Sequence, residues 1–346
     1  MSRLLLLLAF SLPFQTLLFA QQQPGKQTGA AITLLPNGWS LSPAGSSLPL
    51  GDLPLNMAVS PNRRYIAVTN NGQGKQSLQL LDSKKGKLLH TLEIPISWLG
   101  LAFASDNRTL YVSGGNSNAI LRYRINQEKL VLQDTLTLGN PWPVRISPAG
   151  LCVDDEKNLL YVVSKGNNAV YVLDTRSKAV LHRDSIGKEL YTCVLTPDRK
   201  NLLITHWGGN ELVIWNTEQR RVSSRIPVGD NPNDLIINKK GTLAYIACAD
   251  DNTVNIVDLR RGKVIQTLAA TLYPNLLTGS TTNGVALSPD EKTLYVANAD
   301  NNCLAVFDVS DPLQSRSLGF IPTGWYPTCV KTVGKNIFVS NGKGFS

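Results

Sequence analysis

The residues of this chain that could do chemistry are scattered along it, and His206 is the most unusual of them. It stands beside Trp207 after an apolar run, where a histidine could act as a base, a metal ligand or a hydrogen-bonded spacer. The other histidines, His90 and His182, fall in expected outer strands, so a multi-histidine metal site is not expected. For a lone histidine we favour the structural interpretation.

No other group of residues has the spacing of a catalytic or metal site. Asp250, Asp251 and Asp300 lack the D-x-D-x-D-G pattern of a calcium loop, and we interpret them as solvated turn residues. There is no G-x-S-x-G elbow, glycine-rich phosphate loop or HExxH sequence. Pairing His206 with Asp250 or Glu211 as acid and base would be a guess. We therefore predict no catalytic residue, no metal and no cofactor.

A recurring strand pattern must position these residues. Each unit has a Leu-Tyr-Val-like strand, an Asn/Asp/Gly-rich turn and a second strand, and the units recur at about 42 to 50 residues, as propeller blades do. β-branched and aromatic residues dominate these runs, as strands prefer. Because one unit cannot bury both faces of its own sheet, the repeat predicts an all-β fold, a seven-bladed β-propeller of four-stranded antiparallel blades.

Six repeats are complete and the last one is partial. Their expected bounds are near 54–97, 98–141, 142–189, 190–232, 233–281, 282–327 and 328–346. Residues 21–53 contain a strand–turn–strand pattern, and we predict that this N-terminal segment closes the last blade. An open ring would leave an exposed sheet edge, which is a template for aggregation.

The strand order places the connectors that begin each repeat on the same face as the turns between second and third strands. The candidate binding residues on this face are Trp98, Trp142, Tyr191, His206, Trp207, Asn233, Asn283, Trp325 and Tyr326. Aromatic rings beside amides suit a glycan, a peptide or a partner loop at the channel mouth. The alternative is that the rings only pack between blades and that Asn supplies the positive φ of tight turns.

Residues 1–20 are predicted to be a secretory signal peptide. Arg3 supplies the positive start, an apolar run follows, and cleavage is expected after Ala20. The rival interpretation is a membrane anchor, but Ser11 and Pro13 interrupt a run that falls short of the ~20 apolar residues a span needs. The expected location is secreted or periplasmic, with no transmembrane span after cleavage.

The net charge of +9 comes from scattered Lys and Arg residues. A basic exported protein favours anionic glycans, cell-surface polymers or acidic lipids. Nucleic-acid binding would require a basic stripe interleaved with aromatic residues, which is absent, so no nucleic-acid partner is predicted. The five cysteines fall in five different repeats, mostly within strands, and we interpret them as small apolar residues.

The repeat resembles the YVTN-type β-propeller family, through residues 65–70 (Tyr-Ile-Ala-Val-Thr-Asn) and 294–298 (Leu-Tyr-Val-Ala-Asn). The two ends, residues 35–45 and 339–346, are similar to the N-terminal propeller of exported bacterial bifunctional proteins. In those proteins a seven-bladed propeller precedes an alkaline-phosphatase-like phosphoesterase domain. That domain is not in this sequence, so its activity is not carried over, and the chain is expected to be a truncated or split member.

These observations predict an exported, non-catalytic binding or scaffolding module. Its partner would be a phosphoesterase domain or a separate protein, with a glycan or peptide at the channel mouth. Two alternatives stay open. One is a lactonase-like hydrolase acting at the channel mouth, as the resemblance to phosphogluconolactonase-like propellers implies. The other is a structural surface-layer protein.

Overall fold

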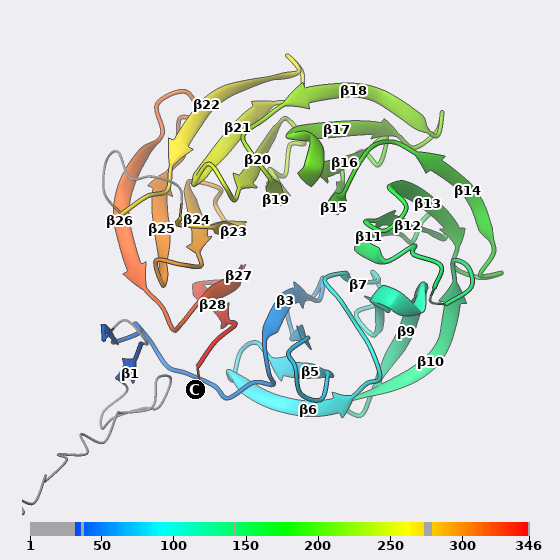
Figure 1. Ribbon diagram of the computed structural model, residues 1–346, viewed down its shortest axis with the longest axis horizontal. Coiled ribbons are helices and arrows are strands. Elements are labelled where there is room, and N and C mark those ends of the chain that lie inside the picture. Colours follow the sequence, from blue (N-terminus) through cyan, green and yellow to red (C-terminus); the bar gives the residue numbers. More distant parts are fainter. Residues whose placement is uncertain (1–31, 36–37, 142, 273–278, 345–346) are drawn as a thin grey trace, which may run out of the picture.

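The chain forms a ring of antiparallel sheets around a central axis (Figure 1). The computed structural model describes residues 32–35, 38–141, 143–272 and 279–344. The predicted signal peptide and Trp142 lie outside these residues. Within them, no helix is long and apolar enough to cross a membrane. Six sheets have four strands each, which confirms the predicted all-β propeller with four-stranded antiparallel blades.

In each of these six blades the strands lie side by side in chain order. Blade one consists of β3 (Pro54–Val59), β4 (Tyr65–Asn70), β5 (Ser77–Asp82) and β6 (Lys87–Glu93). Blade two consists of β7 (Leu101–Phe103), β8 (Thr109–Ser113), β9 (Ala119–Asn126) and β10 (Lys129–Thr137). Blade three consists of β11 (Pro148–Asp154), β12 (Leu159–Ser164), β13 (Ala169–Asp174) and β14 (Val180–Ser185). Blade four consists of β15 (Leu190–Leu195), β16 (Asn201–His206), β17 (Glu211–Asn216) and β18 (Arg221–Pro227). Blade five consists of β19 (Pro232–Ile237), β20 (Leu243–Cys248), β21 (Thr253–Asp258) and β22 (Lys263–Ala269). Blade six consists of β23 (Thr282–Leu287), β24 (Thr293–Asn298), β25 (Cys303–Asp308) and β26 (Arg316–Pro322). Short 3₁₀ turns, η1 (Gly115–Ser117) and η2 (Trp207–Gly209), follow β8 and β16.

The core lies between neighbouring blades, because each sheet buries apolar side chains on both faces. Trp215 of β17 is fully buried and meets the ring of Tyr161 of β12 edge-on, with the ring centroids 6.1 Å apart. Its indole N–H donates to Asp184 of the preceding blade at 2.9 Å. Burial of the ring and satisfaction of its one donor together fix blade four against blade three.

An asparagine in the left-handed conformation ties each of five blades to the next. Each has a φ between 54° and 57° and accepts hydrogen bonds on its side-chain oxygen from the connector that leads into the following blade. The five residues are Asn118, Asn168, Asn210, Asn252 and Asn302. Asn tolerates this region of φ better than other non-glycine residues, and its side chain can bind backbone groups. These asparagines hold the connectors of the channel-mouth face in place.

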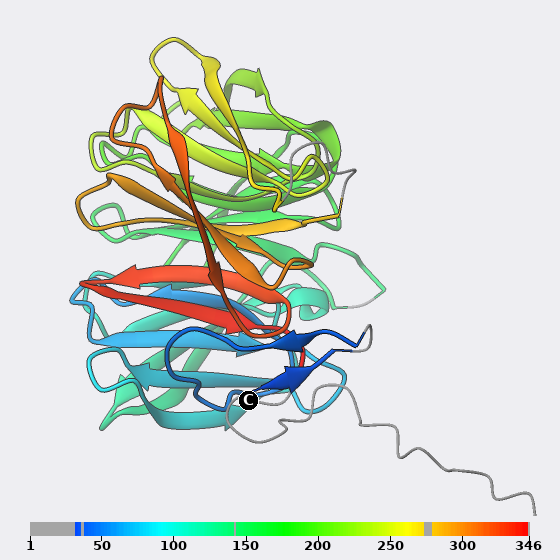
Figure 2. The same cartoon turned by 90° about the vertical axis from the view of Figure 1, so that its left-hand side faces the viewer.

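The seventh blade has two strands among the described residues, β27 (Pro327–Val333) and β28 (Asn336–Asn341). It closes the ring against blade one, where the Thr328 hydroxyl donates to the Pro54 carbonyl at 2.5 Å and Cys329 packs beside Met57. The N-terminal strands β1 (Thr33–Leu34) and β2 (Ser40–Leu41) pair with each other in a separate sheet (Figure 2).

The predicted completion of the last blade by the N-terminal segment is therefore not confirmed. No described pairing joins β1 or β2 to β28. The segment instead contacts the ring through Leu48 and Leu50, which pack on the cluster between blades seven and one. Gly51 then donates from its N–H to Gln79 of blade one at 3.0 Å. These contacts lead the chain onto blade one.

Candidate functional site

The channel mouth is built from inner strands that are bulged where they begin. The pairing of first and second strands shifts register near the mouth in every blade except the second, for example between Pro232 and Leu235 and between Pro327 and Cys329. A bulge re-aims the side chains next to it, and bulges are frequent beside functional sites.

Two aromatic rings from different blades meet here. Trp98, on the connector into blade two, and Tyr191 make an edge-to-face pair with centroids 6.5 Å apart. Tyr191 was expected on a connector but lies in the inner strand β15 of blade four, as Asn233 and Asn283 lie in β19 and β23. Both rings are half-buried. Burial raises the pKa of the Tyr191 phenol, and the nearby Asp234 adds to the rise. The phenol is therefore neutral at physiological pH and available as a hydrogen-bonding group.

A charged pair joins the inner strands of blades five and seven. Lys331 of β27 approaches Asp234 of β19, with Nζ 3.9 Å from Oδ2. The same carboxylate oxygen accepts the Val285 N–H at 3.1 Å. Burial alone would lower the pKa of Lys331, but Cys329 and Asp234 raise it to about 12. Asp234 and Lys331 were missed in the sequence; a charge inside an inner-strand pattern is the signal that could have found them.

The remaining predicted amides and rings lie around this pair. Asn233 donates from Nδ2 to the Asn283 side-chain oxygen at 3.3 Å, across blades five and six. Burial raises the pKa of Tyr326, and the side chain of Asn283 opposes the rise. Trp325 is half-buried in the same connector as Tyr326. The contacts described thus join inner strands and connectors of blades two, four, five, six and seven.

Lysines cover two of the aromatic rings on this face. The Lys165 ammonium lies 4.8 Å from the centroid of the Trp207 ring, and Lys343 lies 3.9 Å from that of Tyr326. Such cation–π contacts are worth about 0.5–1 kcal/mol at exposed sites. In each contact the lysine ammonium lies over one face of the ring.

His206 is held in place by its neighbours. Its Nε2 accepts the Lys188 N–H at 2.8 Å, so the proton is on Nδ1, which donates to Glu211 at 3.2 Å. Glu211 also accepts from Arg225 at 2.8 Å. Burial alone would raise the pKa of Glu211, but Arg225 and His206 lower it. With both ring nitrogens engaged, His206 acts as a spacer between β16 and the connector before blade four.

The described residues contain no group of three or more His, Cys, Asp or Glu side chains that could hold a metal ion. All five cysteines are free thiols. Burial raises the pKa of Cys152 and of Cys248 to about 12, which keeps both protonated and unreactive at neutral pH.

The ring of blades defines the chain as a β-propeller protein. It belongs to the family described as "Lactonase, 7-bladed beta-propeller", whose family model matches residues 101–342. This agrees with the resemblance to a propeller-repeat family, while the link to a phosphoesterase stays a prediction.

Curated relatives and solved structures extend this picture. The uncharacterised protein YncE of Salmonella typhi is 26% identical over 273 residues, covering 76% of this chain and 69% of its own. The non-catalytic subunit wuho of a tRNA (guanine-N(7)-)-methyltransferase from Drosophila mojavensis is 24% identical, covering 86% and 76%. Kuenenia stuttgartiensis hydrazine synthase has a TM-score of 0.70 at 19% identity, covering 86% and 95%. The RRP9 WD40 repeats have a TM-score of 0.71 at 16% identity, covering 87% and 92%. The two structures show a shared fold alone.

Proposed function

We propose that this chain is an exported, non-catalytic binding module whose channel mouth holds a segment of a partner or a glycan. The partner would be a phosphoesterase domain or a separate protein. The N-terminal segment would help to close the seventh blade when the partner is bound. This chain would share the fold of its family but not the lactonase activity that the family description names.

One observation carries the proposal: the mouth offers binding surfaces, while its most promising catalytic side chain is already engaged. Trp98, Tyr191, Trp207 and Tyr326 present half-buried rings with amides beside them. His206, for which the sequence left open a role as a base, has both ring nitrogens in hydrogen bonds. A general base needs a free nitrogen within reach of the proton that it abstracts.

A relative that matches most of this chain supports this interpretation. The wuho protein is by its name a non-catalytic subunit of a methyltransferase. A propeller that serves a separate catalytic chain is the arrangement proposed here, with a different partner.

A lactonase-like hydrolase is the second candidate, and Asp234 is the observation that favours it. Its carboxylate lies in the channel beside Lys331, and the family description names lactonases. Such a carboxylate would activate water while the ammonium stabilised the developing oxyanion. Oδ2 of Asp234 already accepts the Val285 N–H and lies 3.9 Å from the Lys331 Nζ, so one of the two carboxylate oxygens is engaged.

Glycan and peptide arrays probed with the full chain test the binding proposal. We expect Trp207→Ala combined with Tyr326→Ala to lower the affinity for any array ligand at least about tenfold, because stacking on an aromatic ring is lost. Leu313→Ala is the matched control, since Leu313 is exposed in the turn between β25 and β26 on the opposite face. Equal binding by the double variant and the wild type would contradict the proposed site.

A further inference from the structure

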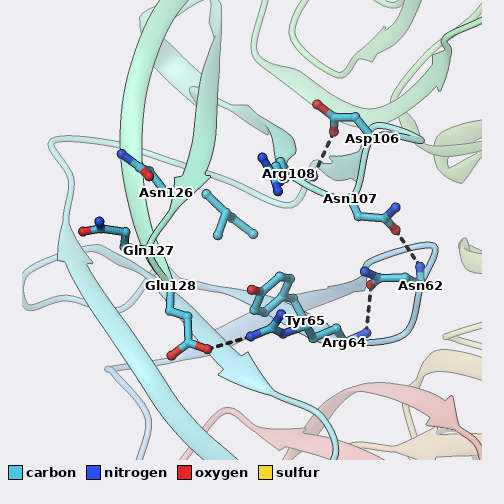
Figure 3. A pocket seen from close by; sticks show the side chains of 10 residues that line it. Asn62, Arg64, Tyr65, Asp106, Asn107, Arg108, Asn126, Gln127 and Glu128 are labelled. Atoms are coloured by element: carbon cyan, nitrogen blue, oxygen red, sulfur yellow. Dashed lines mark hydrogen bonds and ion pairs between the residues drawn. The ribbon is translucent and has the colours of Figure 1, made fainter.

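A second cavity lies on the face opposite the channel mouth, between blades one and two (Figure 3). Its volume is about 480 Å³, within the range of roughly 300–1,000 Å³ that is typical of small-molecule sites. It is lined by the turns β3–β4 and β7–β8 and by the hairpin tip β9–β10. None of the residues predicted from the sequence lines it.

Two bonds between the blades hold this cavity open. On one side the Asn62 N–H donates to the side-chain oxygen of Asn107 at 2.6 Å. On the other side Arg64 pairs with Glu128 at 2.8 Å, and its guanidinium lies 5.0 Å from the centroid of the Tyr65 ring. The cavity is therefore bounded on both sides by specific contacts between blades one and two.

The charges around the cavity do not cancel locally. Glu128 is neutralised by Arg64. Asp106 accepts the backbone N–H groups of Arg108 and Thr109 and the Thr109 hydroxyl, each at 2.8 Å, so its oxygens are engaged by its own turn. The exposed guanidinium of Arg108 has no hydrogen bond or ion pair with any residue that the structure describes. One unpaired cation thus faces the cavity.

The hairpin tip adds unpaired amides in a strained turn. Gln127 and Glu128 have φ of 47° and 62°, two consecutive non-glycine residues in the left-handed region. The corresponding turns of blades one and five place glycine there, at Gly86 and Gly262. The side-chain amides of Asn126 and Gln127 have no hydrogen-bond partner among the residues described. Strain of this kind clusters at ligand-binding positions.

From this geometry we infer that the cavity binds a carboxylate-bearing saccharide. Arg108 supplies a planar pair of donors that matches a carboxylate. The amides of Asn126 and Gln127 donate to and accept from sugar hydroxyls. Ile125 and Tyr65 form the apolar floor of the cavity, although both side chains are largely buried in the core between blades one and two. The net charge of +9 attracts such acidic ligands from a distance.

Isothermal titration calorimetry of the full chain tests the inference with three probes: tri-galacturonate, monomeric galacturonate and neutral galactotriose. We expect tri-galacturonate to bind at least about tenfold more tightly than galactotriose, because a charge-assisted pair is lost without the carboxylate. If monomeric galacturonate binds as tightly as tri-galacturonate, the ligand is a free sugar acid. If the monomer binds more weakly than the trimer, the ligand is an acidic glycan. Absence of tri-galacturonate binding at millimolar concentration would overturn the inference.

Matched variants locate the site. Arg108→Gln should lower the affinity for tri-galacturonate at least about tenfold. Arg260→Gln removes the same charge from an exposed turn of blade five and should leave it unchanged. Gln127→Gly should raise the melting temperature by about 2 °C by relieving the positive φ and still weaken binding. An equal loss in both arginine variants, or unchanged binding in Gln127→Gly, would overturn the assignment.

Discussion

Replacing Asn118 tests whether the left-handed asparagines hold the connectors of the channel-mouth face. Asn118 is fully buried, with a φ of 55°. Its side-chain nitrogen donates to the carbonyls of Asn140 and Val144 at 2.7 and 2.6 Å, and its oxygen accepts the N–H groups of Ile146 and Ser147 at 3.0 Å. Asn118→Gly removes these four bonds and retains the backbone freedom that a positive φ requires.

The magnitude follows from the four bonds. Each contributes about 1 kcal/mol net, and water replaces some of them at the connector, so Asn118→Gly should cost about 2–4 kcal/mol. Asn118→Ala should cost about 1 kcal/mol more, because a Cβ in the left-handed region is strained. The difference between the variants therefore separates conformational strain from hydrogen bonding.

Equilibrium urea denaturation measures these costs. Asn336→Gly is the control, since Asn336 is exposed at the start of β28 and should lose less than about 1 kcal/mol. A loss below about 1 kcal/mol in Asn118→Gly would refute the reasoning. It would mean that the connector holds its position without the side chain.

Three further predictions concern buried groups. Because Lys331 has its pKa raised from 10.5 to about 12, its contribution to stability is complete below the lower value and is lost as the pH rises through the higher one. The melting temperature should therefore fall more steeply with rising pH in the wild type than in Lys331→Met. Parallel curves of melting temperature against pH would contradict this. His206→Leu should destabilise the fold by about 1–3 kcal/mol in urea titrations, because the Lys188 N–H and Glu211 lose their partner; an unchanged midpoint would exclude the spacer role. Thiol titration should release five thiols after denaturation and react slowly before it, since burial keeps them protonated, and fewer than five would indicate disulfides.

The strands were predictable because their side chains repeat a simple physical pattern. Tyr65 and Tyr161 mark second strands whose residues are buried on both faces, and a run of apolar residues ended by turn chemistry signals this directly. The way in which the ring closes was harder to predict from the sequence. The strand–turn–strand pattern of residues 21–53 signals a local pairing of Thr33–Leu34 with Ser40–Leu41, but whether these strands also join β28 depends on register between distant segments.

The candidate site was predictable only in outline. Topology placed Trp98 and Tyr191 on one face, but their edge-to-face contact depends on how the connector that carries Trp98 lies relative to β15, which carries Tyr191. The pairing of Asp234 with Lys331 joins residues that are far apart in sequence and was not anticipated. The turn at Gln127 and Glu128 lacks the glycine or asparagine that usually signals a two-residue hairpin, so the second cavity left no trace in the sequence.

Hydrolysis of glucono-δ-lactone by the purified full chain tests the central claim most directly. The claim that the channel mouth binds without catalysing predicts a rate equal to that in buffer, for the wild type and for Asp234→Asn alike. Turnover by the wild type that is abolished in Asp234→Asn would contradict it and would establish the channel carboxylate as a catalytic residue.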